Sequence, residues 1–175
     1  MAGEGDIYIG YSQTPQLPSN GGAPDTANDA TATNPLGIRC RWKGNTYRYV
    51  LFSNGTGDVA SAAKGAAYWS ALNPQTPTYT VTSDESDSLF GINGAAGIFG
   101  GVVTDGYYTW IQCAGLRQVT ATGAFVTGDK IIGSSTDLTF GRIALGSNNT
   151  DVVFGVVQSG STSGGPTVLL QAMDW

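Results

Sequence analysis

The chain contains no histidine, and only 12% of its 175 residues are charged. A typical globular protein carries about 25% charged residues. Without imidazole, the chain lacks the commonest general base of enzymes and the commonest metal ligand. We therefore expect that it is not an enzyme and has no catalytic residues, no metal site and no cofactor.

Clustered positive charge is also missing. Eight Lys and Arg residues stand against thirteen Asp and Glu residues, which gives a formal net charge of −5. Because affinity for nucleic acid depends on clustered cations, we expect no nucleic-acid partner. The longest uncharged apolar run, residues 89–103, is too short and too rich in glycine to cross a bilayer, so we expect no membrane partner. The first ten residues lack the basic and apolar segments of a secretory signal, which predicts synthesis in the host cytoplasm.

Cysteine is scarce. Cys40 and Cys113 are the two thiols, and neither belongs to a C-x-x-C motif. Lone cysteines in a protein made in the cytoplasm typically behave as small buried hydrophobic residues. A disulfide between the two is the alternative interpretation.

Glycine, in contrast, is abundant, with 26 residues besides 7 prolines. Turn residues at this density, between short apolar stretches, predict a mainly β protein formed by a single antiparallel β-barrel or β-sandwich. A β-hairpin is the clearest element, because residues 38–43 alternate apolar and cationic side chains and a Gly-Asn turn leads into residues 46–52. The further predicted strands cover residues 79–82, 97–104, 107–112, 116–120, 130–132, 138–145, 152–157 and 167–171.

One short α-helix is predicted over Val59–Leu72. This stretch is rich in alanine, Asp58 precedes it as a suitable N-cap, and Asn73-Pro74 follows it.

The N-terminal region has a different composition. Residues 11–36 contain four prolines among small polar side chains and almost no large apolar group. Such a stretch buries too little surface to offset its ordering entropy. We therefore predict an extended N-terminal arm over residues 1–36, followed by a β-rich domain over residues 37–175.

Six residues are predicted to contact a partner. The apolar and aromatic group at the start of the arm favours a strand added to a partner's sheet edge, although an edge strand of the chain's own fold fits equally well. Four of the eight cations fall in the hairpin, where they either meet an acidic partner or form a solvated strand face. The predicted contact residues are Ile7, Tyr8, Ile9, Tyr11, Arg39 and Arg41.

The densest acidic cluster is Ser83-Asp84-Glu85-Ser86-Asp87-Ser88. Several carboxylates at close range are what Ca²⁺ prefers. The cluster lacks the glycine and the distal glutamate of an EF-hand loop, and is typical of a solvated turn.

The stretch from Gly106 to Leu170 carries a series of short motifs. A tryptophan-bearing strand (106–112) is followed by a Gly-Asp-Lys turn (128–130), by a Val-Val-Phe-Gly-Val-Val strand (152–157) and by a terminal Val-Leu-Leu (168–170). This order resembles the small β-barrel or β-sandwich proteins that decorate the heads of tailed bacteriophages. The resemblance does not cover the N-terminal arm.

The resemblance implies a structural virion protein, a capsid decoration or cement protein, made without an active site. Proteins of this kind bind the outer surface of the capsid, often as homotrimers, and hold neighbouring coat subunits together. The implied partners are the major capsid protein and further copies of this chain.

A carbohydrate- or receptor-binding module of a phage tail or fibre is the alternative function. Four tryptophans and eight tyrosines would supply a platform on which sugars stack. Their positions in predicted elements favour a core location for Trp69 and Trp110.

Overall fold

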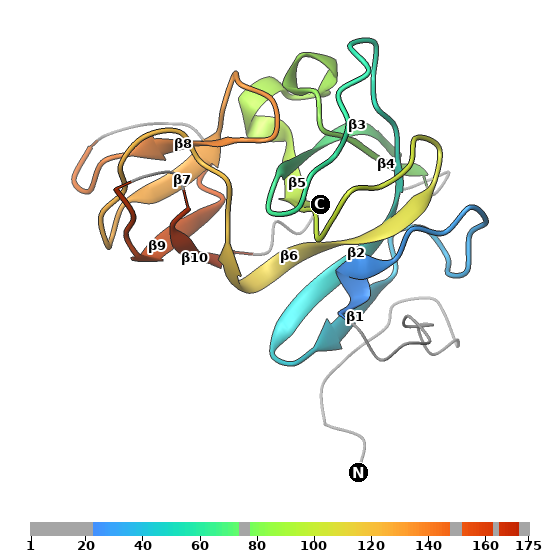
Figure 1. Cartoon of the computed structure of the whole chain (residues 1–175), viewed down its shortest axis with the longest axis horizontal. Helices are drawn as coiled ribbons and strands as arrows, with labels where there is room; N and C mark the ends of the chain where they lie inside the picture. Colours follow the sequence, from blue (N-terminus) through green and yellow to red (C-terminus); the bar gives the residue numbers. More distant parts are fainter. Residues whose placement is uncertain (1–22, 74–77, 148–151, 163–164, 172–175) are drawn as a thin grey trace.

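The computed structural model describes residues 23–73, 78–147, 152–162 and 165–171, which form ten β-strands and three short 3-10 turns. The strands follow one hydrogen-bonded order, β1-β2-β4-β3-β5-β6-β10-β9-β7-β8. Strand β2 also pairs with β6, so that β2, β4, β3, β5 and β6 close into a barrel (Figure 1). The predicted mainly β class is therefore confirmed.

The barrel strands are joined mostly by antiparallel pairing, with one short parallel contact between β2 and β4. The elements of this part of the chain are η1 (Pro24–Thr26), β1 (Arg39–Trp42), β2 (Asn45–Phe52), β3 (Ala66–Asn73), β4 (Thr78–Thr82), η2 (Glu85–Asp87), η3 (Gly91–Gly94), β5 (Ala95–Ile98) and β6 (Tyr108–Gln118).

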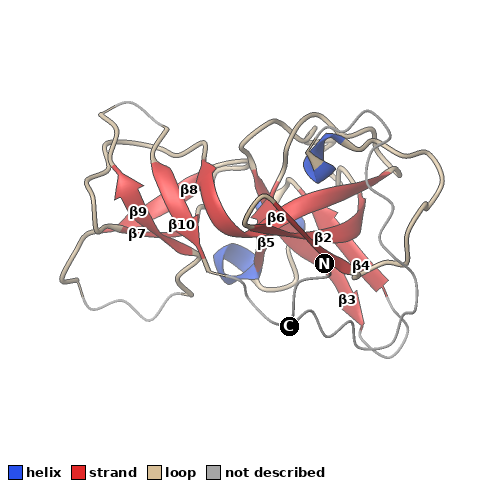
Figure 2. Ribbon diagram, turned by 90° about the horizontal axis from the view of Figure 1, so that it is seen from below, coloured by secondary structure: helices blue, strands red, loops and turns tan. Residues whose placement is uncertain are grey.

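A second β unit lies beside the barrel and is reached through β6. Figures 1 and 2 both show β7 to β10 as a separate group of strands next to β2 to β5. We call this group, with the end of β6, the C-terminal unit. Its own strands are β7 (Lys130–Gly133), β8 (Phe140–Ile143), β9 (Gly155–Ser159) and β10 (Thr167–Leu170).

Strand β6 belongs to both units. Its first part pairs with β2 as far as Ala114, and its last part, from Gly115, pairs with β10. Gly115 stands at the transition with φ +100°, and a Cβ at this position would overlap the side chain of Asn45. Only glycine combines this backbone angle with such a close approach. Because of this residue, one strand replaces the two that were predicted at residues 107–112 and 116–120.

The predicted hairpin is confirmed as β1 and β2, but its turn lies one residue earlier than the predicted Gly44-Asn45. Trp42 pairs with Asn45, so the turn consists of Lys43 and Gly44, both with positive φ. Two consecutive positive φ values are typical of the type I′ turn, whose twist matches that of the two strands.

The helix predicted over Val59–Leu72 is wrong. No α-helix occurs in the part of the chain that the structure describes, and the second half of this stretch is the start of β3. Ala67 and Trp69 point into the barrel core, whereas Ala66 and Tyr68 pack into the core of the C-terminal unit. Because both faces of β3 are buried, the strand lacks the alternation of apolar and polar residues by which strands are recognised.

The boundary of the N-terminal arm also needs correction. Residues 23–36, which we call the strap, lie against the barrel instead of extending away from it. Ala27 and Leu36 pack against a buried cluster that contains Tyr49 and Trp110. The prediction of a free arm can therefore apply only to residues 1–22, which lie outside the described residues.

Candidate interaction surfaces

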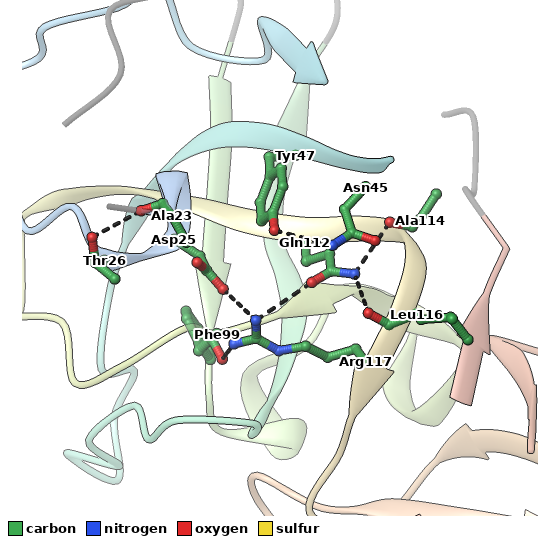
Figure 3. A network of polar contacts seen from close by, with 10 residues as sticks. All are labelled: Ala23, Asp25, Thr26, Asn45, Tyr47, Phe99, Gln112, Ala114, Leu116 and Arg117. Atoms are coloured by element: carbon green, nitrogen blue, oxygen red, sulfur yellow. Dashed lines mark hydrogen bonds and ion pairs between the residues drawn. The ribbon is translucent and has the colours of Figure 1, made fainter. Parts of the chain in front are cut away.

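The strap is fixed to β6 by a buried ion pair (Figure 3). Asp25 is 2% exposed, and its Oδ2 lies 2.8 Å from Nη1 of Arg117. The two atoms are close enough for an ion pair, although they do not have the alignment of a hydrogen bond. Arg117 also donates from Nη2 to the carbonyl of Phe99 and from Nη1 to Oε1 of Gln112.

Gln112 completes this network by donating from Nε2 to the carbonyls of Ala114 and Leu116 (Figure 3). These carbonyls flank Gly115. The network therefore joins the strap to the point at which β6 passes from the barrel to the C-terminal unit.

Burial raises the pKa of Asp25 above its ordinary value of 3.8, and the attraction of the Arg117 guanidinium opposes this effect only in part. The charged carboxylate is therefore more costly in the folded chain than in water.

Further contacts hold the strap along its length. Asp29 and Tyr108 exchange backbone hydrogen bonds of 2.9 Å. The hydroxyl of Tyr49 donates to Oδ2 of Asp29 at 2.9 Å, and Thr109 donates to the carbonyl of Ala27 at 2.8 Å. The strap is thus an ordered layer on the outside of β2 and β6, and it fixes where the chain before it leaves the folded body.

The structure describes two of the six predicted contact residues. Ile7, Tyr8, Ile9 and Tyr11 lie outside the range that the structure describes. Arg39 and Arg41 lie on β1, which is at one end of the strand order and pairs with β2.

The hairpin cations do not form one solvated face. Arg41 and Lys43 are exposed and Arg39 is half-buried, but Arg48 is only 3% exposed. Arg39 and Arg41 both take part in further interactions, so neither is a free cation. The hairpin therefore does not present a uniform charged surface.

An exposed apolar surface that sequence reasoning missed lies on the C-terminal unit. Leu116 of β6 and Leu169 of β10 are direct cross-strand partners, and they are 56% and 42% exposed. Leu169 also pairs with Val156 of β9, which is half-buried. We call these three residues the leucine face. Directly opposed residues in an antiparallel pair lie on the same side of a sheet, so the three side chains form one row.

The alternation of buried and exposed side chains along Thr167–Leu170 contained a signal for this surface. Val168 and Leu170 are buried, whereas Leu169 between them points outward. A single exposed apolar residue is common, but a contiguous exposed apolar row on one sheet face is a candidate contact surface.

The three tryptophans that the structure describes do not form an exposed platform. Trp69 is 1% exposed and Trp110 is fully buried, as their predicted core positions required. Trp42 is half-buried, with Nζ of Lys43 4.3 Å from the centre of its ring. Trp175 lies outside the described residues.

The acidic cluster is held by local hydrogen bonds. Asp84 caps η2 by accepting from the backbone N–H of Ser86, and Asp87 accepts from the hydroxyl of Thr56. In the described part of the chain, no three His, Cys, Asp or Glu residues are grouped so that they could hold a metal ion. Within those same residues, no helix has the length and apolar character needed to span a membrane.

Both cysteines are buried, and no disulfide joins them. Burial, with a smaller contribution from Cys113, raises the pKa of the Cys40 thiol to about 12. A thiol with so high a pKa is protonated near neutral pH and is a poor nucleophile.

Comparison with known proteins gives distant structural likenesses. No family model and no curated protein matches the chain. Among solved structures, the chain is similar to the N base of the head fiber protein gp8.5 of bacteriophage phi29, with a TM-score of 0.45 and 12% sequence identity. The likeness covers 74% of this chain and 98% of that chain.

Proposed function

We propose that this chain is a structural protein of a tailed-phage particle that binds the outer surface of the head and stabilises contacts between coat subunits. It works without a catalytic step or a cofactor, its partners are the major capsid protein and further copies of itself, and it sits on the capsid as a homotrimer.

The leucine face is the observation that carries this proposal. It lies within Gly106–Leu170, the stretch whose motifs resemble head decoration proteins. Two leucines at outward positions of adjacent strands expose apolar surface on a rigid sheet. Because each is already about half buried, covering one in a contact contributes about 1 kcal/mol. A cement protein needs a surface of this kind, because it must hold its position on a shell under internal pressure.

The strap supports the same proposal from the other end of the chain. It anchors residue 23 to the barrel through the Asp25 ion pair, so that residues 1–22 start from a fixed point. An arm that starts from a fixed point reaches a neighbouring subunit with less loss of conformational freedom than one on a loose tether.

A sugar-binding role is less well supported. Aromatic stacking needs exposed ring faces, and the two tryptophans in the barrel are buried. We therefore place a receptor- or carbohydrate-binding module second.

The test is co-sedimentation of the purified chain with empty phage heads that lack it. The double variant L116D/L169D is expected to reduce occupancy about tenfold or more, because it places charge at the contact. V102D is the matched control, since Val102 is 70% exposed and lies outside the leucine face. Its occupancy is expected to equal that of the unmodified chain.

Two results would contradict the proposal. One is full occupancy by L116D/L169D, and the other is equal loss by both variants. A glycan array read with the same proteins separates the alternative function, because specific sugar binding by a chain that does not sediment with heads would favour the tail or fibre module.

A further inference from the structure

Arg48 is a buried cation whose charge the described residues leave unpaired. It lies on the inward face of β2, two residues before Val50 and four before Phe52, both of which belong to the barrel core. Its side chain is 3% exposed, and neither Nε nor Nη1 has a hydrogen-bond partner. The ion pairs found among the described residues join Asp25 to Arg117 and Asp129 to Arg142.

Two aromatic rings fix the position of this guanidinium. Its central carbon lies 5.6 Å from the ring centre of Trp69 and 5.8 Å from that of Tyr79. Cation–π attraction stabilises the charge, but a ring face is a poor substitute for an acceptor in the plane of the N–H groups.

The indole of Trp69 also lacks a hydrogen-bond acceptor. Its Nε1 is buried without a hydrogen-bond partner, in a side chain that is 1% exposed. Arg48 and Trp69 are thus neighbours that both offer buried donors and no acceptor. A buried donor without a partner is disfavoured, and an unpaired buried charge is disfavoured more strongly.

We infer that Arg48 and Trp69 form a carboxylate-binding site beside the barrel core. A carboxylate supplies acceptors only and carries the charge that compensates a guanidinium. Tyr79 is half-buried, so it forms the side of the site nearest solvent. Its ring lies against Gly37, where a Cβ would overlap it, and this places the site beside the join between the strap and β1.

The carboxylate has two potential sources. One is the chain itself or a second copy, since Glu4 and Asp6 precede the strap in sequence. The other is a free or partner-borne carboxylate. This inference does not depend on the proposed role on the phage head.

The experiment uses ¹⁵N NMR of the full chain, following the Nε–H resonance of Arg48 and the indole N–H of Trp69 during a titration with sodium acetate. A saturable shift of both resonances in the unmodified chain supports a free or partner-borne carboxylate. If the chain's own carboxylates fill the site, the E4Q/D6N substitution shifts both resonances before any acetate is added. Acetate then shifts them further in that variant and has no effect on the unmodified chain.

Matched arginine variants provide the control. R48M replaces the cation by an apolar side chain of similar length, which a barrel core tolerates, and it is expected to abolish the shift of the Trp69 indole. R41M removes an exposed arginine of the same hairpin and should leave the shift unchanged. No response to acetate in the unmodified chain and in E4Q/D6N, or equal loss in R48M and R41M, would overturn the inference. So would a response to phosphate with none to acetate.

Discussion

Each of the two β units contains a buried aspartate paired with an arginine, and the two pairs behave in opposite ways. In the C-terminal unit, Oδ2 of Asp129 lies 2.6 Å from Nε of Arg142. Burial disfavours its ionisation, but hydrogen bonds from the backbone N–H groups of Val126 and Leu145, together with Arg142, outweigh burial and lower the pKa. Asp25 has its arginine but lacks two such donors from other residues, and its pKa is raised.

The difference shows that an arginine neighbour alone does not decide whether a buried carboxylate ionises readily. Desolvation dominates at Asp25, whereas two backbone N–H donors and Arg142 together outweigh desolvation at Asp129. The sign for stability follows. Asp129 contributes stability that is present above pH 3.8 and is lost as the pH falls through its lowered pKa. Asp25 has the reverse effect, since stability is lost as the pH rises from 3.8 through its raised pKa.

The largest change in stability is expected when the strap, which carries Asp25, is removed from the barrel. Deletion of residues 1–36 takes away the strap, leaves Arg117 without its carboxylate and uncovers Tyr49 and Trp110. We expect a loss of about 4 kcal/mol or more, which lowers the thermal midpoint by roughly 10 °C. Deletion of residues 1–22 is the control, and calorimetry should find its midpoint nearly unchanged. Equal midpoints for the two deletions would mean that the strap contributes nothing.

The next effect breaks the pair in the C-terminal unit. D129N loses the charge that Arg142 faces and replaces one acceptor oxygen by a donor, so two backbone N–H groups compete for one oxygen. We expect a loss of about 3 kcal/mol at pH 7, measured by urea unfolding. Unfolding of this variant should also lose part of its acid dependence below pH 3.8. A variant as stable as the parent at pH 7 would contradict the assignment.

A smaller effect concerns the residue that joins the two units. G115A is expected to destabilise by about 2–3 kcal/mol, because it combines a positive φ with overlap against Asn45. G106A is the control: Gly106 also has a positive φ, but nothing lies within 4 Å of an added Cβ. Its loss should be about 1 kcal/mol, and urea unfolding of both variants should show the difference. Equal losses of stability in the two variants would show that backbone strain alone accounts for the effect of G115A.

The smallest change we expect is in D25N. The amide avoids the desolvation of a charge, and Arg117 is 22% exposed, so water can compensate part of the lost ion pair. We expect a net effect of about 1 kcal/mol or less at pH 7. The informative readout is the slope of stability against pH just above 3.8, which should become flatter than in the parent. An unchanged slope would mean that Asp25 titrates normally.

The sequence correctly predicted the elements whose pairing partners are close along the chain. The hairpin of β1 and β2 was recognisable because its alternation and its two-residue turn are local. Strand β3 was mistaken for a helix, because its two faces are covered by different cores and its small residues, Ala66 and Ala67, read as helix formers. The burial of Arg48 could not be predicted for a similar reason, since Trp69 and Tyr79 come from distant strands.

The candidate surfaces were less predictable than the fold. Asp25, Asn28 and Asp29 are polar residues in a proline-rich stretch. Nothing local shows that their partners lie on β2, on β6 and in the loop before β6. Asn28, for example, bonds to Thr104 through both side-chain atoms. The leucine face depends on which side of β10 is covered, and only the pairing with β6 and β9 determines that.

The shared strand β6 also has a consequence for synthesis. The barrel closes when β6 pairs with β2, and the C-terminal unit starts from the other end of the same strand. A ribosome that has released residues 38–98 has therefore made four of the barrel's strands with two open edges. Closure waits for residues 108–118, and the contacts that follow join segments far apart along the chain. Such topologies fold slowly, and their open edges invite pairing between nascent chains. The interval between release of β5 and release of β6 is thus the stage at which this protein is most exposed to aggregation.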